Sequence, residues 1–192
     1  NGNQGRGVAT NLRSEAEVRA AYAAAYARED EVLLEKYAPG CDWRLLVIGD
    51  KLVAAARREP AHVFGDGKRT IRDLVAEVNK DPRRSDGHAT ALSFVKLDDV
   101  ALEVLKSQGF EADSVPPSGL KVLIRRNANL STGGTAEDVT DTVHPDVAAR
   151  AIEAAKVVGL DIAGIDIVAE DISQPLEDQH GVIVEVNAAP GL

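Results

Sequence analysis

The sequence predicts an α+β fold with mostly antiparallel sheets flanked by helices. Helical and strand patterns alternate irregularly along its 192 residues. They include a strong hairpin signal, which favours α+β over a doubly wound parallel sheet. The last two strand patterns, residues 164–168 and 184–187, are apolar but carry acidic and amide side chains. The length is sufficient for one ordinary domain, or two small lobes, with a sizeable core.

The composition excludes several classes of function. The net charge is −9 and aromatic residues make up 4% of the chain, and no basic stripe with interleaved aromatics indicates a nucleic-acid surface. No apolar run approaches membrane-spanning length and no signal peptide is visible, so we expect no membrane association. The single cysteine, Cys41, excludes an intramolecular disulfide and fits a reducing compartment, so we predict a cytoplasmic protein.

The chain begins with a glycine-rich stretch, residues 1–8. Glycines let backbone amides approach an anion closely, so this stretch is either a phosphate-binding loop or a disordered terminus. No Gly-Lys-Ser/Thr ending is present, and no strand precedes it in this sequence. Because the chain starts inside this loop, lacks methionine and stops after Pro190-Gly191, we expect it to be a piece of a longer protein.

A helix and a strand follow. Ser14 with Glu17 forms a capping-box pattern, which predicts a helix ending near residues 28–30. The expected apolar face of this helix consists of Val18, Ala21, Tyr22, Ala25 and Tyr26. Residues 31–37 are predicted to form a strand that ends at the Pro39-Gly40 turn.

The middle of the chain alternates strands, helices and polar loops. Residues 43–48 and 52–58 predict a hairpin around Gly49-Asp50, and Thr70 caps a predicted helix that ends near residue 79. The polar loop 81–88 is either a surface excursion or a substrate loop. A helix is predicted over residues 96–108 and a strand over residues 121–126. The stretch 127–135 is rich in glycine, hydroxyl and amide groups, so it is either a turn or a contact for phosphate or peptide backbone.

The end of the chain contains the strongest candidate site. A helix from Pro145 to Val158 is followed by the two terminal strands. Glu185 and Asn187 are two residues apart, so their side chains point to one face of a strand, and Asp166 on the other strand is placed to join them. Two carboxylates and an amide oxygen suit a hard cation such as Mg²⁺. The alternative is a pair of edge strands with polar outer faces.

In their order, these segments resemble the ATP-grasp superfamily and, within it, the cyanophycin synthetases. The superfamily order is glycine loop, Val-Leu-Leu-Glu-Lys-Tyr hinge, hairpin, Gly-Ile-Asp-Ile-Val and Glu-Val-Asn-Ala-Ala-Pro-Gly. The closer resemblance rests on residues 56–63, 79–84, 128–135 and 159–166, and it covers essentially the whole chain.

The resemblance implies a fold in which two α+β lobes clasp ATP, with this chain forming the later part of the clasp. Residues 1–60 would carry the glycine loop, a helix and the adenine hinge, and residues 61–192 the remainder, with an insert loop and the metal-binding strands. A carboxylate would attack the γ-phosphate of ATP, and an amine would then displace phosphate from the acyl phosphate. The partners would be ATP, aspartate and the cyanophycin polymer, and the full-length protein could be a homo-oligomer.

The resemblance also implies roles for individual residues. Adenine would lie against Glu35, Lys36, Tyr37 and Ala38, the ribose against Asp42, and the phosphates against amides of Gln4, Gly5, Arg6 and Gly7. Mg²⁺ would be held by Asp166, Glu185 and Asn187. The acyl phosphate and polymer carboxylates would meet Arg83 or Arg84, with Arg58 and Arg125 as further candidates. Other substrate contacts would come from Asn129, Ser131, Gly133 and Gly134.

Two departures from the family pattern weigh on catalysis. The lysine that reaches the nucleotide phosphates belongs to a strand before the glycine loop, outside this sequence, so we expect the isolated chain to be inactive. Cys41 also occupies the position where cyanophycin synthetases are expected to carry histidine. If that histidine assists proton removal from the amine, its role is either unfilled in this chain or passes to His62 or His88. The cysteine would otherwise be a small buried thiol.

Other functions compete with this interpretation. Glutathione-synthetase-like and D-alanine-ligase-like enzymes are the nearest enzymatic alternatives, although the Arg83-Arg84 loop and the stretch 127–135 weigh against them. Cys41 and the missing first lobe favour a non-catalytic module that binds nucleotide or polymer. A purely structural domain would leave the set of Asp166, Glu185 and Asn187 unexplained.

Overall fold

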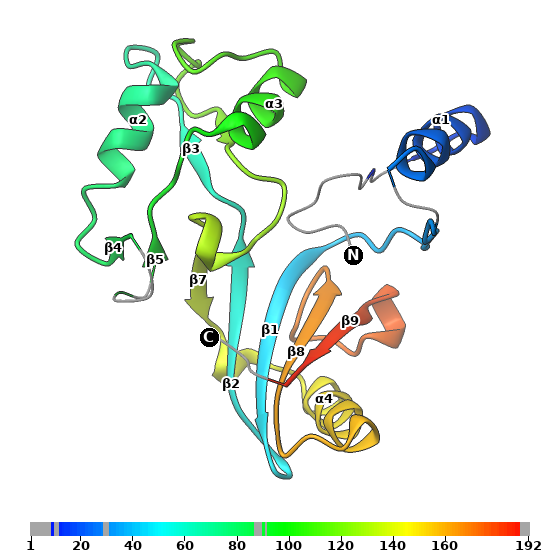
Figure 1. The fold of residues 1–192 in the computed structure, drawn as a ribbon. Coiled ribbons are helices and arrows are strands. Elements are labelled where there is room, and N and C mark those ends of the chain that lie inside the picture. Colours follow the sequence, from blue (N-terminus) through cyan, green and yellow to red (C-terminus); the bar gives the residue numbers. More distant parts are fainter. Residues whose placement is uncertain (1–8, 10–11, 29–30, 87–89, 91, 189–192) are drawn as a thin grey trace. The chain divides into compact units, whose positions relative to one another are not determined.

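The computed structural model describes residues 9, 12–28, 31–86, 90 and 92–188. The chain divides into two units, residues 1–39 and residues 40–192. The first unit contains the helix α1 (Glu15–Tyr26), and every strand described below belongs to the second (Figure 1). Within the described residues, no helix is both long and apolar enough to cross a membrane.

Helix α1 begins where the sequence predicts. The Ser14 hydroxyl accepts a hydrogen bond from the Glu17 amide, and the Glu17 carboxylate accepts one from the Ser14 amide, so the capping box is confirmed. Tyr22 and Tyr26 stack with ring centroids 5.9 Å apart. No residue of α1 is buried, so within the part of the chain that the structure describes the predicted apolar face is not covered, and its Tyr22 and Tyr26 are exposed.

The strand predicted over residues 31–37 is wrong. These residues form no strand and no helix, and the large side chains of Leu33 and Leu34 are 80% and 71% exposed. A β-strand needs a neighbouring strand to accept and donate its backbone hydrogen bonds. None of the strand pairs in the described residues includes this segment, so its apolar pattern alone does not make it a strand.

The second unit is built on a five-stranded antiparallel sheet in the order β7-β2-β1-β8-β9 (Figure 1). Its strands are β1 (Cys41–Ile48), β2 (Lys51–Glu59), β7 (Thr135–Asp138), β8 (Ile162–Ala169) and β9 (Val182–Asn187). The predicted hairpin is β1–β2, and Gly49 in its turn has φ +60°, which favours glycine. Gly40 is also required, because a Cβ there would lie 2.4 Å from the Ala169 carbonyl carbon.

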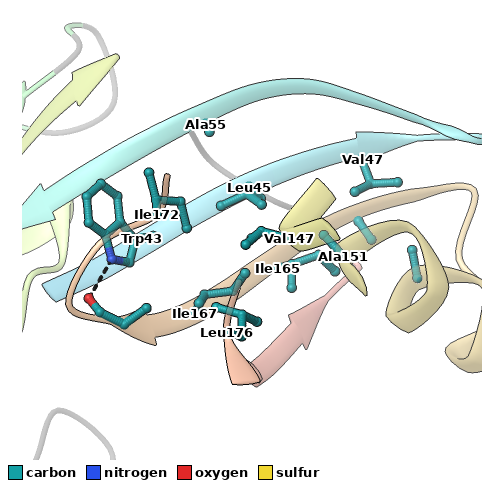
Figure 2. Close-up of a cluster of buried hydrophobic side chains, with 13 residues drawn as sticks. Trp43, Leu45, Val47, Ala55, Val147, Ala151, Ile165, Ile167, Ile172 and Leu176 are labelled. Carbon is teal, nitrogen blue, oxygen red and sulfur yellow. Dashed lines mark hydrogen bonds between the residues drawn. The ribbon is translucent and has the colours of Figure 1, made fainter. Parts of the chain in front are cut away.

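One face of this sheet is covered by helix α4 (Pro145–Val158), whose bounds are the ones predicted. Side chains alternate along a strand, so Trp43, Leu45 and Val47 of β1 all point to that face and are buried. They pack with Ile165 and Ile167 of β8 and with buried residues of α4, as Figure 2 shows. The Trp43 indole donates to the Ala169 carbonyl at 2.9 Å, so the polar edge of this large ring is satisfied.

The same unit contains a second hydrophobic core, smaller than the first. It joins the strand pair β3 (His62–Phe64) and β6 (Lys121–Leu123) to the helices α2 (Ile71–Val78) and α3 (Asp99–Ser107). Its centre is fully buried and apolar, with Ile71, Leu105 and Ile124 at 0% exposure. Beside it, β4 (Arg84–Ser85) and β5 (Leu92–Ser93) form a short parallel pair.

Several boundaries differ from those predicted. Helix α3 starts at Asp99 rather than residue 96, because the Asp98 carboxylate caps it by accepting from the Ala101 amide. Strand β6 ends at Leu123, three residues earlier than predicted, and β3, β4, β5 and β7 were not predicted at all. Short 3-10 helices, Leu130–Thr132, Thr140–Thr142 and Glu177–Gln179, occupy three polar connections.

Candidate functional site

The polar face of the five-stranded sheet lies opposite the α4 core. Along strand β1, Asp42 and Arg44 alternate with the buried Trp43 and Leu45, so their side chains point to this polar face. The strand register then aligns Arg44 with Asp166 of β8, and Asp166 with Glu185 of β9. Residues directly opposite on antiparallel strands share a face. The pairing therefore brings residues separated by more than a hundred positions in sequence into one row.

Two further residues extend this row. Arg58 of β2 lies opposite Asp42. Asn187 of β9 lies opposite Gly164, two residues from Asp166, and its amide Nδ2 is 3.2 Å from Asp166 Oδ2. We call the set of Asp42, Arg44, Arg58, Asp166, Glu185 and Asn187 the polar row.

Asp166 is the hub of the polar row. Both of its carboxylate oxygens accept from the Arg44 guanidinium, Oδ1 from Nε and Oδ2 from Nη2 at 2.7 Å. Asn187 Nδ2 donates to Oδ2 as well. The side chains of Arg44 and Asp166 are 11% and 26% exposed, so this charged pair is largely withdrawn from water. Its bidentate geometry is the strong form of an arginine–carboxylate contact.

The charges of the row perturb one another. Desolvation by the neighbouring strands, and then repulsion from Asp166, raise the pKa of Asp42 above its ordinary value, although Arg58 opposes the shift. Asp42 nonetheless keeps contact with solvent. For Arg58, desolvation and then repulsion from Arg44 lower the pKa. Two shifted pKa values, those of Asp42 and Arg58, in a row of alternating charges make this face a candidate functional site.

The predicted magnesium ligands fall together. Asp166 and Glu185 face one another across β8 and β9, and Asn187 bonds to Asp166. Glu185 is exposed, so a cation reaches it from solvent. Two carboxylates and one amide oxygen are hard donors, which suits Mg²⁺ held jointly with phosphate oxygens and water. Among the residues that the structure describes, no three His, Cys, Asp or Glu side chains group for a metal, so the candidate set depends on the Asn187 amide as its third donor.

The neighbouring arginines Arg83 and Arg84 have different environments. Arg83 is exposed and its guanidinium pairs with Asp81 at 2.7 Å. Arg84 is 7% exposed, and its Nη1 donates to the carbonyls of Ser93 at 2.7 Å and Gly133 at 3.0 Å. Arg83 is therefore the one available to an anionic substrate, and Arg84 joins two loops through their backbones.

The two glycines of the 127–135 stretch are explained by packing. Gly133 has φ +93°, and a Cβ there would lie 2.9 Å from the Val95 Cα. A Cβ on Gly134 would lie 2.8 Å from the Glu59 carbonyl. The turn is closed by the Gly134 amide, which donates to the Asn129 carbonyl at 3.1 Å, while Asn129 and Ser131 are exposed.

Arg125 and His62 are held by local partners. Arg125 is 6% exposed, and its Nη2 donates to the Asp98 carboxylate at 2.7 Å. His62 Nδ1 lies 2.8 Å from the Pro60 carbonyl. Because a carbonyl only accepts, Nδ1 carries the proton and a neutral imidazole keeps Nε2 as an acceptor. Cys41 Sγ lies 3.7 Å from Arg57 Nη2.

The remaining predicted residues lie outside this unit or outside the described residues. The adenine candidates Glu35, Lys36, Tyr37 and Ala38 belong to the unit of residues 1–39, and Tyr37 is 57% exposed there. The phosphate-loop candidates Gln4, Gly5, Arg6 and Gly7, together with His88, fall outside the described residues. Their roles stay predictions.

Arg44 is the residue that the sequence reasoning missed. It lies two positions after Asp42, and the period-two rule that joined Glu185 to Asn187 applies equally on β1. An arginine inside an apolar strand, on the same face as a candidate ribose ligand, was the available signal.

Comparison with known proteins indicates the family. A model of the RimK-like ATP-grasp domain matches residues 124–192, which contain β8 and β9. The crystal structure of a bifunctional glutathione synthetase from Pasteurella multocida superposes with a TM-score of 0.67 at 33% identity, over 94% of this chain and 24% of that one. In sequence and in fold, the chain is similar to ATP-grasp proteins. The predicted α+β ATP-grasp fold is thereby confirmed.

Within the ATP-grasp superfamily, the chain is most informatively compared with two groups of curated relatives. It is 50% identical over 190 residues to cyanophycin synthetase of Trichormus variabilis, and 50% identical over 192 residues to that of Synechocystis. It is 39% identical over 168 residues to the glutathione biosynthesis bifunctional protein of Clostridium perfringens, over 88% of this chain.

These comparisons confirm the resemblance to cyanophycin synthetases, which covers 99% of the chain. The chain spans only about a fifth of the length of these relatives, 21% and 22% of the two cyanophycin synthetases. ATP-grasp ligases as a class use ATP and Mg²⁺ and join a carboxylate to an amine. The polar row lies on the strands that the domain model matches and on the adjoining hairpin.

Proposed function

We propose that this chain contributes the metal corner and part of the nucleotide site of an ATP-dependent carboxylate–amine ligase. The observation that carries the proposal is the polar row, in which the strand register brings Asp166, Glu185 and Asn187 together on one face. The 50% identity to cyanophycin synthetases supports the sharper form of the proposal. In that form, the enzyme extends the polyaspartate backbone of cyanophycin by adding aspartate to its terminal carboxylate.

The reaction divides into two displacements. A carboxylate oxygen of the polymer forms a bond to the γ-phosphorus of ATP as the bond to the β–γ bridging oxygen breaks, releasing ADP. The amine of the incoming aspartate then bonds to the acyl carbon, the acyl–oxygen bond breaks, and phosphate leaves. The amine loses a proton to a nearby base. Arginine would be attached to the side chains by a separate ligase module.

Asp166, Glu185 and Asn187 would hold Mg²⁺, which supplies positive charge near the transferring phosphoryl group. Asp42 accepts from the ribose hydroxyls in this proposal, since its carboxylate is open to solvent at the start of β1. The adenine would be held by residues 35–38 and the phosphates by amides of residues 4–7.

Positively charged residues are assigned to the substrate by their place in the fold. Arg58 on the polar row and Arg83 on the exposed loop bind the acyl phosphate and the polymer carboxylates through bidentate contacts. Arg84 and Arg125 are buried and already donate to protein oxygens, so they shape the substrate side by holding its loops, together with the turn of Asn129, Ser131, Gly133 and Gly134. The base for the amine proton would be His62, whose neutral ring has Nε2 as an acceptor, or His88.

The test uses the complete protein and measures phosphate release from Mg-ATP with aspartate, arginine and a short cyanophycin-like primer. Release that requires the primer and aspartate supports the proposal, and its absence contradicts the cyanophycin form. Release with γ-glutamylcysteine and glycine instead would move the assignment to a glutathione-type ligase. ATP binding without turnover on any of these substrates would indicate a non-catalytic module.

A paired variant tests the metal corner. Glu185→Gln keeps the size of the side chain and removes its charge, so turnover should be lost if Glu185 holds the metal. Glu137→Gln on the exposed strand β7 removes an equal charge outside the polar row and should leave turnover unchanged. Equal turnover in both variants would remove Glu185 from the site.

A further inference from the structure

The Arg44 guanidinium binds the Asp166 carboxylate, which the proposed function assigns to a metal. Its Nε and Nη2 donate to the two oxygens of Asp166, and Asn187 Nδ2 donates to one of them. Each carboxylate oxygen of Asp166 therefore already has a hydrogen-bond donor, and its negative charge already has a neighbouring positive charge. Both Arg44 and Asp166 are largely withdrawn from water.

A cation that binds Asp166 competes with this pair. Mg²⁺ requires a lone pair of a carboxylate oxygen, and in Asp166 Oδ2 already accepts from both Arg44 and Asn187 while Oδ1 accepts from Arg44. The two positive charges would also repel each other strongly at contact distance in a site of reduced dielectric. A metal on either oxygen would therefore lie against the Arg44 guanidinium, and we expect its binding to break at least one of the two Arg44 hydrogen bonds.

We propose that Arg44 is the internal counter-cation of Asp166, which exchanges with Mg²⁺ and so makes metal binding depend on the arrival of an anion. The inference rests on the proposed function, since it takes Asp166 as a metal ligand. Arg44 is a positioning residue in this scheme, because it holds the Asp166 carboxylate on the polar face until the metal takes its place.

The charge balance explains the dependence on an anion. Without metal, the polar row has the two positive charges of Arg44 and Arg58 against the three carboxylates of Asp42, Asp166 and Glu185, a net charge of −1. Adding Mg²⁺ makes the row net positive, and it leaves the released guanidinium close to the second arginine. An anionic group such as the phosphates of a nucleotide restores the balance. Metal alone should therefore bind weakly, and metal and nucleotide should each strengthen binding of the other.

The experiment measures divalent-metal affinity without nucleotide, using the complete protein and Mn²⁺ as the probe, read from the loss of the free Mn²⁺ paramagnetic resonance signal. Arg44→Gln removes the charge and the bidentate contact. It should tighten Mn²⁺ binding by at least about tenfold, the equilibrium equivalent of one charge-assisted hydrogen bond. The gain in Mn²⁺ affinity on adding a non-hydrolysable ATP analogue should shrink in the same variant.

A matched variant separates exchange from simple electrostatics. Arg58→Gln removes a positive charge from the same face, and in the strand register Arg58 lies opposite Asp42 whereas Arg44 lies opposite Asp166, so it should tighten Mn²⁺ binding much less than Arg44→Gln. Arg44→Lys keeps the charge and loses the bidentate fork, and it should give an intermediate affinity. Equal effects of Arg44→Gln and Arg58→Gln would overturn the exchange and leave only long-range repulsion.

The outcomes also separate this inference from the proposed function. Mn²⁺ binding that is lost in Glu185→Gln but unchanged or weakened in Arg44→Gln would contradict the exchange and keep the metal corner. No Mn²⁺ binding in any variant, with or without the nucleotide analogue, would contradict both. Because Asn187 can still bond to Asp166 in Arg44→Gln, circular dichroism should show an intact fold. If that variant fails to fold, Arg44→Lys alone decides, and an affinity no tighter than that of the unsubstituted protein contradicts the exchange.

Discussion

Arg44 and Arg84 lie in the same unit. Arg44 shares the polar row with Arg58, and Arg84 follows Arg83 in the chain, but the hydrogen-bond partners of Arg44 and Arg84 differ in kind. Arg44 binds a carboxylate on an accessible face of the sheet, whereas Arg84 is buried and binds the backbone carbonyls of Ser93 and Gly133. A carboxylate can exchange its partner for a metal or a substrate cation. A carbonyl in the interior has no alternative partner, so its arginine is part of the architecture. The partner therefore distinguishes a ligand-binding arginine from a structural one.

The largest expected effect is at the hub of the polar row. Asp166→Asn keeps a hydrogen-bonding side chain beside Arg44 and Asn187 but removes the charge that a metal requires. Turnover in the complete protein should fall by about a hundredfold or more, the loss typical of removing one electrostatic contact to a transition state. Phosphate release measures it, with Glu137→Gln as the control. If the two variants turned over equally, Asp166 would have no role in catalysis, and its contact with Arg44 would be structural, like the contacts of Arg84.

The elements that make the polar row were predictable because two simple patterns coincide there. Apolar alternation located β1, β2, β8 and β9, and polar residues at period two within them indicated one functional face. The family order then gave Asp166, Glu185 and Asn187 a common role. Arg44 was missed only because the same rule was not applied to β1.

The Arg84 region was not predictable from sequence, for a physical reason. An arginine in a polar loop next to another arginine suggests an exposed cation, and only long-range packing buries one of them. The partners of Arg84 are backbone carbonyls, which every residue has, so no side-chain pattern marks them. Residues 31–37 illustrate the same limit, since an apolar pattern predicts a strand but not the neighbour that a strand needs.

The second effect should be on stability, and it tests the structural half of the comparison. Arg84→Ala leaves two carbonyl acceptors without their donor, which should lower the free energy of unfolding by about 3 kcal/mol. Arg83→Ala, its neighbour, removes only an exposed ion pair with Asp81 and should change stability by less than about 1 kcal/mol. Urea denaturation measures both. Equal destabilisation would show that burial of Arg84 has no structural consequence.

A smaller loss of stability is expected at Gly133, whose carbonyl accepts from Arg84. Gly133→Ala forces a positive φ of +93° on a residue with a Cβ, which would sit 2.9 Å from the Val95 Cα. We expect a loss of about 2 kcal/mol, from backbone strain and the displacement of Val95. Gly119→Ala has a similar φ of +80° but open space around its Cβ, so it should lose about 1 kcal/mol through strain alone. Equal thermal midpoints would show that Val95 yields without cost.

The smallest expected effect is on how the stability of the folded protein depends on pH, through Asp42 of the polar row. The pKa of Asp42 is raised, chiefly by desolvation and then by Asp166, so its ionised form is less favourable in the folded protein than in the unfolded chain. Ionisation of Asp42 therefore costs stability, and the cost grows as pH rises from the ordinary value of 3.8 through the raised pKa. Asp42→Asn should accordingly be more stable than the unsubstituted protein at pH 7, and the difference should vanish below about pH 3.8.

Asp81, outside the polar row, should show the opposite dependence of stability on pH, because its pKa is lowered. Its carboxylate accepts from the Arg83 side chain and backbone, which lowers its pKa to about 2. Asp81→Asn should be slightly less stable than the unsubstituted protein at pH 7, and the two should converge as the pH falls from 3.8 towards 2. Nucleotide-free urea denaturation across this pH range measures both variants. If Asp42→Asn were the less stable partner at pH 7, Asp42 would be stabilised by Arg58 more than it is opposed by Asp166, and the row would be a structural ion-pair network like the contacts of Arg84.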